Sequence, residues 1–235
     1  MCLITFKWQS TTRKLELWAN RDEFYARPTR PAHLWENQQT WGGVDLQAGG
    51  SWLAIQKGGR MAALTNIRQG EPQGAKRSRG DLIRHFCTSD LDAPSYWASL
   101  KPSEYGGFNF LLLDSEGLWF GASNQPLIQL ESGIYGLSNA SLNTPWPKVE
   151  AVKNAWVGGD VEQAMRNPES YPDWLLPRTG IPIEWERRLS AAFIQSEDYG
   201  TRAQTYLLLE NNQFSAIEQS FGPGADDMRI EISGF

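Results

Sequence analysis

A cysteine stands second in the sequence, directly after Met1. Methionine before a small residue is usually removed, which would make Cys2 the first residue of the mature chain. The exposed amine has an ordinary pKa of about 7.7 to 8.0 and the thiol one of about 8.5, so the amine can act as base for its own thiol. No histidine is then needed, and His33 and His85 lie beside no recognisable partner. The alternative is that Cys2 is a small apolar residue in an ordinary strand.

A charged run, Asn20-Arg21-Asp22-Glu23, can be placed beside Cys2 by a hairpin. A turn centred between Thr11 and Thr12 pairs apolar with apolar residues, and a one-residue slip would send one apolar set to the wrong face. The register pairs Trp8 with Leu15, Phe6 with Leu17, Ile4 with Ala19 and Cys2 with Arg21. Arg21 would then favour the thiolate, and Asp22 or Asn20 could orient the amine. The alternative is that these charges are solvated at a strand end.

Three further polar clusters end expected strands: Thr65-Asn66, Ser138-Asn139 and Tyr199-Gly200-Thr201-Arg202. Each asparagine can donate a hydrogen bond to a developing oxyanion. Arg202 can bind a carboxylate or stabilise the surroundings of the nucleophile. Such residues also occur in ordinary turns, so the clusters alone leave both interpretations open.

The composition restricts the class of protein. The 22 basic and 27 acidic residues among 235 give a net charge of -5, which argues against a nucleic-acid surface. The short basic cluster Lys76-Arg77-Ser78-Arg79 is expected to be a solvated loop. Two cysteines exclude a disulfide framework and fit a reducing compartment. No apolar stretch approaches the ~20 residues that span a bilayer, so we expect a cytoplasmic protein without an integral membrane segment.

The elements expected around these residues are antiparallel hairpins interleaved with two blocks of helices, which predicts an α+β fold with sheets sandwiched between helix layers. Gly58-Gly59 indicates a hairpin turn, and Ser78 to Asp81 has the form of a helix cap. Residues 27–31 are expected to form a loop because of their prolines, and residues 41–52 a glycine-punctuated turn. Strands are expected at 52–56, 61–66, 108–114, 118–122, 134–139, 201–210, 213–219 and 228–232, and helices after Ser78 and at 94–101, 148–157 and 184–195.

Several stretches spread over most of the chain closely resemble the NRDE family, also called the Transport and Golgi organisation 2 family. They are Met1 to Ile4, Ala19 to Thr29, Leu46 to Leu53, Ala63 to Asn66, Ser78 to Gly80 and Tyr199 to Arg202. The resemblance implies a single domain over residues 1–235. That family is distantly similar to N-terminal-nucleophile hydrolases of the choloylglycine hydrolase and penicillin V acylase type. The resemblance therefore also implies a four-layer αββα sandwich of two mainly antiparallel sheets.

The same resemblance implies roles for individual residues. Cys2 matches the nucleophile, Arg21 and Asp22 the nearby charged pair, Asn66 and Asn139 the two asparagines, and Arg202 the late arginine. Those hydrolases carry Arg-Asn-x-Asp, whereas this chain has Asn-Arg-Asp. Adjacent strand residues point to opposite faces, so Arg21 and Asp22 both face Cys2 only if the strand bulges or ends there. Otherwise Asn20 replaces Asp22.

Two functions follow as expectations. The first is hydrolysis of an amide or thioester of an apolar acyl substrate through Cys2, with Asn20 and Trp52 binding the substrate in a Trp-lined pocket and no cofactor required. The alternative is non-enzymatic binding and trafficking of haem or an acyl lipid, since the family is associated with haem trafficking and lipid homeostasis. His85 or Cys2 would then be an axial ligand. A scaffold that has lost both activities is a third possibility.

Overall fold

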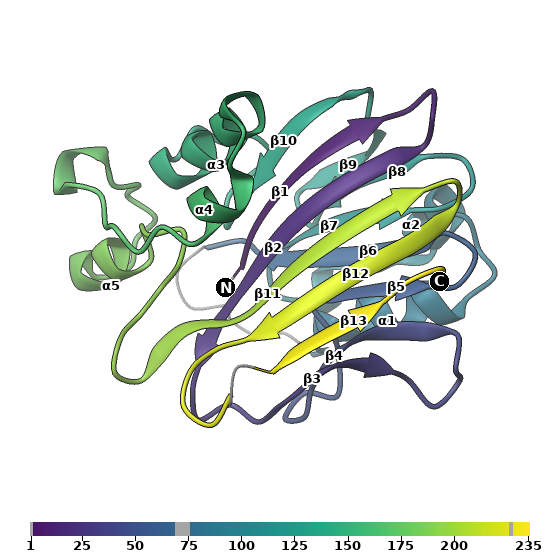
Figure 1. Ribbon diagram of the computed structural model, residues 1–235, viewed down its shortest axis with the longest axis horizontal. Coiled ribbons are helices and arrows are strands. Elements are labelled where there is room, and N and C mark those ends of the chain that lie inside the picture. The colour runs from purple at the N-terminus through teal and green to yellow at the C-terminus, as the bar shows by residue number, and fades with distance from the viewer. Residues whose placement is uncertain (1, 69–75, 226–227) are drawn as a thin grey trace.

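The computed structural model describes residues 2–68, 76–225 and 228–235, which form two antiparallel sheets and five α-helices (Figure 1). The first sheet has the strand order β10-β1-β2-β11-β12-β13 and the second the order β3-β4-β5-β6-β7-β8-β9. The strands are β1 Cys2–Gln9, β2 Lys14–Phe24, β3 Thr29–Leu34, β4 Thr40–Asp45, β5 Leu53–Gln56, β6 Arg60–Asn66, β7 Phe108–Leu113, β8 Leu118–Ala122, β9 Gln125–Gln129, β10 Gly133–Leu137, β11 Tyr199–Glu210, β12 Gln213–Ser220 and β13 Arg229–Ile232. The helices are α1 Gly80–Thr88, α2 Ala93–Ser99, α3 Pro147–Gly158, α4 Val161–Met165 and α5 Ile183–Arg188.

The opening hairpin has the expected register. Cys2 pairs with Arg21, and the three apolar pairs further along β1 and β2 are also those that the pattern predicts. Their side chains are buried between the sheets, which explains why a slip of one residue would be costly. β2 pairs on its other edge with β11 and is therefore a central strand.

The hairpin of β5 and β6 is closed as expected by Gly58 and Gly59, whose φ angles are 91° and 92°. Because Gln56 pairs with Arg60, the connection has three residues, Lys57, Gly58 and Gly59, and glycine reaches the positive φ of the last two without a steric cost. Every residue of β7 is buried, as the uniformly apolar sequence from Phe108 predicts for a strand covered on both faces.

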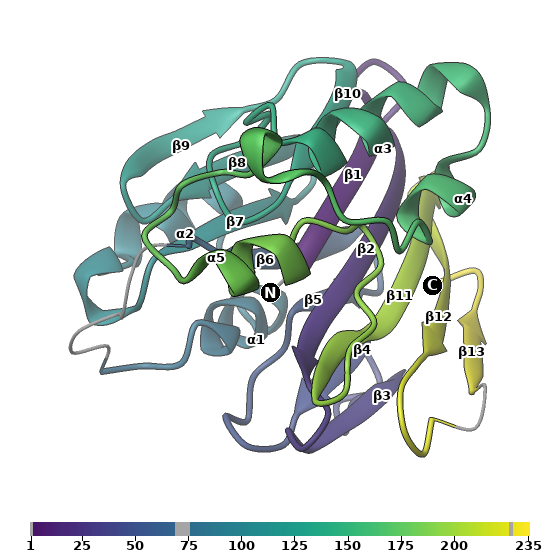
Figure 2. The same cartoon turned by 90° about the vertical axis from the view of Figure 1, so that its left-hand side faces the viewer.

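Four apolar clusters lie among the described residues, and three of them hold the layers together. The largest lies between the two sheets and includes Phe6 and Leu17 from the first and Ile55 and Leu111 from the second. A second cluster packs α1 and α2 on the outer face of the seven-stranded sheet. A third packs α3 and α4 against β1 and β2, and Figure 2 shows the two helical groups on different sides of the sheets. The expected α+β class with two antiparallel sheets is confirmed.

Two strands occur where the sequence predicts irregular structure. β3 begins at Thr29, inside the expected loop, and tolerates Pro31 because it is an edge strand with a register shift between Arg30 and His33. β4 occupies the first part of the expected glycine-rich turn. Gly43 is required there because a Cβ at this position would lie 2.1 Å from the Trp52 ring.

Two helix boundaries also differ from expectation. The N-cap of α1 is Arg79 without a side-chain hydrogen bond, so the predicted Ser78 cap is wrong. Only the backbone carbonyl of Ser78 contributes, accepting from the Asp81 N–H at 3.1 Å. α5 ends at Arg188 instead of Gln195, and the chain beyond it turns so that its carbonyls face Lys148. Among the described residues, none of the helices is long and apolar enough to span a bilayer.

Candidate active site

A pocket of about 310 Å³ opens where β1 begins. This volume lies within the range typical of small-molecule sites. The thiol residue Cys2 shares the lining with Trp52 and Asn66, and with three acidic and four basic residues. The charged residues are Asp22, Glu23, Asp45, Arg21, Arg27, Arg77 and Arg79. The pocket thus combines many charged side chains with apolar surface, and Trp52 is the one tryptophan among its described lining residues.

Cys2 is half-buried in this pocket. Burial raises the pKa of its thiol and the charge of Asp22 adds to this, while the positive charge of Arg21 opposes the rise. The carbonyl of Cys2 accepts a hydrogen bond from the Ser138 hydroxyl at 3.3 Å, which anchors the start of β1. The thiol therefore needs a base before it can react as a thiolate. Met1 lies outside the described residues.

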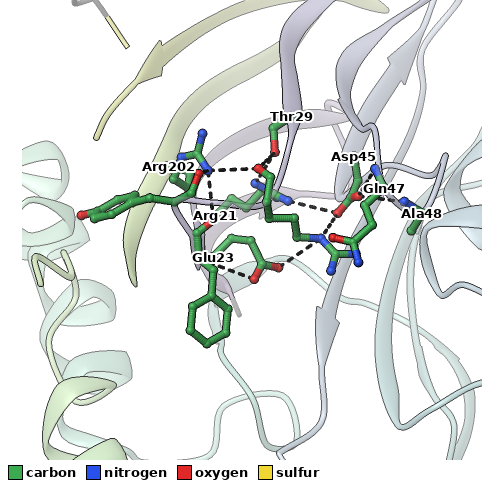
Figure 3. Close-up of polar contacts among 10 residues, drawn as sticks. Arg21, Glu23, Thr29, Asp45, Gln47, Ala48 and Arg202 are labelled. Atoms are coloured by element: carbon green, nitrogen blue, oxygen red, sulfur yellow. Dashed lines mark hydrogen bonds and ion pairs between the residues drawn. The ribbon is translucent and has the colours of Figure 1, made fainter. Parts of the chain in front are cut away.

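Arg21 is held in place on the pocket wall, as Figure 3 shows. Its Nη1 donates to the Thr29 hydroxyl at 3.1 Å and its Nη2 to Oδ2 of Asp45 at 3.2 Å. Its guanidinium lies 4.3 Å from the centre of the Trp52 ring. These three contacts reduce the mobility of the positive charge opposite Cys2.

Asp45 connects two arginines to the loop that follows β4. Its Oδ2 accepts from Arg27 at 2.6 Å as well as from Arg21, and its Oδ1 accepts from the N–H groups of Gln47 and Ala48 (Figure 3). Burial raises the pKa of Asp45, but the hydrogen bonds from Arg27 and Ala48 outweigh this and the pKa is lowered. Asp45 is thus an ionised anchor of the pocket wall.

Asp22 lines the same pocket although it is adjacent to Arg21 in sequence. Cys2 and Arg21 are the last pair of β1 and β2 among the described residues, and Asp22 follows Arg21 on β2. Its Oδ1 accepts from the Thr201 hydroxyl at 2.7 Å. Burial raises the pKa of Asp22, and the nearby positive charge of Lys148 opposes the rise. A register shift between Thr201 and Ala203 on β11 makes Arg202 an extra residue at this level.

Asn20 lies away from the pocket. Its Nδ2 donates to the carbonyls of Met165 and Ala192 at 2.8 Å each, and its Oδ1 accepts from Gln204 at 3.1 Å. Because these bonds use its buried side chain, Asn20 fastens α4 and the segment after α5 to the six-stranded sheet.

The two expected oxyanion asparagines are connected but differ in position. Asn66 lines the pocket, whereas the side chain of Asn139 donates to the backbone carbonyl of Asn66 at 2.8 Å. A buried residue that the sequence did not single out extends this connection: Asn109 donates to Thr65 at 3.0 Å and to the Ala140 carbonyl at 2.7 Å. This network joins the two sheets beside Cys2, and Asn139 is placed to position Asn66.

Arg202 lies outside the lining of this pocket. Its Nη1 donates to the carbonyls of Phe24, Tyr25 and Arg27 at 3.1, 3.1 and 3.2 Å (Figure 3). These bonds secure the turn that carries Arg27 to Asp45. Arg202 instead lines a second cavity, of about 190 Å³, beside Trp52.

The basic cluster expected to be a solvated loop contributes Arg77 and Arg79 to the pocket. The sequence signal for this position is the pair Gly50 and Gly80, which was missed. Because neither residue has a Cβ, the segment around Gly80 can touch the loop around Gly50. A Cβ on Gly50 would lie 2.5 Å from Gly80 backbone atoms. Lys148 is a second missed residue: it is buried beside Asp22, and burial lowers its pKa to about 8.

The described residues contain no group of three or more His, Cys, Asp and Glu side chains able to hold a metal ion. His85 is exposed on α1, and Cys2 is the one described thiol or imidazole residue that lines the pocket. A haem at this pocket would thus have only Cys2 as a protein ligand among the described residues. Its protonated thiol would be a poor ligand, because metals bind the thiolate.

Comparison with known proteins identifies the family. The family model described as Transport and Golgi organisation 2 matches residues 1–223. The Transport and Golgi organization 2 homolog of Mus musculus is 34% identical over 90% of each chain, and the homolog of Bos taurus is 33% identical over 99% of this chain and 97% of its own. The Transport and Golgi organization protein 2 of Drosophila melanogaster is 30% identical over 94% of this chain and 92% of its own. This chain therefore belongs to the Transport and Golgi organisation 2 family.

Proposed function

We propose that this protein is an N-terminal-cysteine hydrolase that cleaves an amide or thioester of an acyl substrate through Cys2. The observation that carries the proposal is the position of Cys2 in a pocket of about 310 Å³ beside both Arg21 and Asp22. A thiol, a fixed positive charge and a carboxylate beside the position of an N-terminal amine are the groups that such a nucleophile needs.

The chemistry runs through an acyl-enzyme. Removal of Met1 leaves the amine on Cys2, where it takes the thiol proton. The sulfur then bonds to the substrate carbonyl carbon while the carbonyl π pair moves to oxygen. The C–N or C–S bond to the leaving group breaks, and the leaving group takes the proton held by the amine. Water then attacks the thioester, which releases the acid and restores the thiol.

Separate residues would support these steps. Asp22 is buried and lines the pocket, so its carboxylate can orient the ammonium. Asn66 lines the pocket, so we assign it the role of donor to the oxyanion, with Asn139 holding its backbone. Helices packed on the outer faces of two stacked antiparallel sheets support the proposal that the fold is of the αββα N-terminal-nucleophile type. We place the protein in the cytoplasm, where its two thiols would remain reduced.

Intact-mass measurement with an electrophilic acyl probe tests the proposal. The expected result is loss of Met1 and one adduct, mapped to Cys2 and absent from Cys2→Ala. Cys87 is an internal control because it is fully buried and burial raises its pKa to about 12. A form with extra residues before Cys2 should react more slowly, since it lacks the adjacent amine. Retained Met1, or an adduct formed equally well on Cys2→Ala, would contradict the assignment.

Haem binding without turnover is the second candidate. Arg77 and Arg79 line the pocket and favour it, because arginines can pair with the carboxylates of haem without an axial ligand from Cys2. Titration with haemin should then give a saturable Soret shift that survives Cys2→Ala while any hydrolysis is lost. A spectrum that stays that of free haemin would rule this function out.

A further inference from the structure

The basic residues around Cys2 are not equally paired. Arg21 and Arg27 share the carboxylate of Asp45, at 3.2 and 2.6 Å, and Arg27 also lies 3.7 Å from Glu23. Their charges are therefore largely matched by carboxylates of the wall itself. The remaining two pocket arginines, Arg77 and Arg79, lie on the segment that leads into α1.

Arg79 is half-buried, and its Nη1 donates to the Gly107 carbonyl at 3.2 Å. Among the described residues no carboxylate lies within ion-pair distance of it. A guanidinium removed from water without a counter-charge is costly, and an anion in the pocket would offset that cost. Arg79 and Cys2 line the same pocket, and burial lowers the pKa of Arg79 while the neighbouring Cys2 opposes this.

Arg77 has a carboxylate partner, but a distant one. The separation from Glu104 is 3.8 Å, and the arginine side chain is 41% exposed. Such a contact contributes little and leaves most of the guanidinium donors available. Its guanidinium lies 5.4 Å from the Tyr105 ring centre, which restrains it. Two guanidiniums two residues apart present planar forks that match the oxygens of a carboxylate or phosphate.

We propose that Arg77 and Arg79 form an anion subsite beside Cys2, which takes a carboxylate or phosphate group of the substrate close to its scissile carbonyl. This inference rests on the proposed hydrolase function and revises its substrate class from wholly apolar to one with an anionic group. The pocket arginines without a close carboxylate partner disfavour an entirely apolar occupant, because burying unpaired charges against hydrocarbon is unfavourable.

Two alkylating probes of similar size, one anionic and one neutral, test the subsite. Iodoacetate and iodoacetamide both form a bond from the Cys2 sulfur to the probe carbon with loss of iodide, and only iodoacetate carries a carboxylate. Relative to a short peptide with an N-terminal cysteine, the ratio of the iodoacetate to the iodoacetamide rate should be about tenfold higher at Cys2. Arg79→Gln and Arg77→Gln should each lower it severalfold. Arg229→Gln, whose side chain is 58% exposed on β13, is the control.

Calorimetric titration of the Cys2→Ala protein measures the subsite without the nucleophile and distinguishes the two anions. Inorganic phosphate and acetate are the probes, and the tighter one identifies the substrate group. Binding that Arg79→Gln or Arg77→Gln weakens about tenfold supports the subsite, even if Cys2 reacts with neither alkylating agent and the hydrolase proposal fails. A peptide-like rate ratio at Cys2, together with no binding of either anion, overturns the subsite and leaves a reactive Cys2 intact.

Discussion

Replacing Glu218 by glutamine is expected to remove a pH dependence from the stability of the fold. Glu218 lies on β12, is 2% exposed and connects the two sheets. Its Oε1 accepts from the backbone N–H of Ala32 on β3 at 2.7 Å, and its Oε2 accepts from the Thr205 hydroxyl at 3.1 Å. Burial raises its pKa from 4.5 to about 7, although both hydrogen bonds and the charge of Arg21 act in the opposite direction.

The sign and size of the effect follow from linkage. Between pH 4.5 and about 7 the folded chain keeps a proton on Glu218 that the unfolded chain has lost, so the free energy of unfolding falls as the pH rises. The full shift of the Glu218 pKa corresponds to about 3 kcal/mol in the free energy of unfolding, at about 1.4 kcal/mol per pKa unit. About 2.5 kcal/mol of it is lost between pH 5 and pH 8. Below pH 4.5 both states are protonated and the contribution is fully present.

Glutamine keeps the geometry without the titration. Its amide oxygen can accept from the Ala32 N–H, and its amino group can donate to Thr205, because a hydroxyl accepts as well as donates. Any constant difference in stability between the two proteins is therefore expected to be small beside the pH-dependent part.

Urea unfolding followed by tryptophan fluorescence measures the effect. Wild type, Glu218→Gln and the control Glu197→Gln, which makes the same change at an exposed position, are compared at pH 5, 6, 7 and 8. Relative to wild type, Glu218→Gln should gain about 2.5 kcal/mol across this range while the control tracks wild type. A constant difference between wild type and Glu218→Gln would refute the raised pKa.

Three further predictions concern other buried features. Arg68→Met removes a 2.6 Å ion pair with Glu186 and leaves a buried carboxylate, which should lower the free energy of unfolding in urea by about 3–5 kcal/mol. The double variant Arg68→Met/Glu186→Met should recover most of this stability. Equal losses in the single and double variants would contradict the reasoning. Gly43→Ala places a Cβ 2.1 Å from the Trp52 ring, so it should destabilise by about 1–3 kcal/mol and shift Trp52, seen as altered near-ultraviolet dichroism; an unchanged spectrum and stability would show that the ring moves freely. In the native protein at pH 8, iodoacetamide should label Cys2 and spare Cys87, because Cys87 is buried and burial raises its pKa to about 12. In urea both thiols should be labelled. Labelling of Cys87 in the native protein would contradict its burial.

The features that the sequence predicted well depend on local pairing. The register of Cys2 with Arg21 follows from apolar alternation across one turn, and the Gly58-Gly59 turn from its own two residues. The edge strand β3 was missed because Pro31 excludes a central strand but not an edge, and a sequence alone does not say which strand lies at the edge. β4 was missed because Gly43 is needed there to make room for the ring of Trp52, a residue outside the strand.

The part of the candidate site that depends on local strand pairing was predictable, and the part that depends on tertiary packing was not. Arg21 is brought to Cys2 by the hairpin alone, whereas Arg77 and Arg79 reach the pocket only because α1 packs on the second sheet and touches the loop at Gly50. Asn139 was expected beside an oxyanion, but its side chain bonds to the Asn66 backbone. A residue type and a strand end indicate polarity, while the direction of the side chain depends on tertiary contacts that local spacing does not contain.

The adjacency of Arg21 and Asp22 is resolved by the end of one strand and a bulge in another. Within the described residues the pairing of β1 with β2 runs as far as Arg21, so the pocket meets the sheet near its end and is lined by successive residues of β2. On the other side of β2, the register shift on β11 makes Arg202 an extra residue, while Thr201 stays opposite Asp22 and donates to it. The extra residue Arg202 donates to three carbonyls of the turn that carries Arg27. The bulge at Arg202, about 180 residues from Asp22 along the chain, thus supports Asp22 through Thr201 and Arg21 through Arg27 and Asp45. Removing the side chain of Arg202, which lies outside the pocket lining, should therefore disturb the pocket.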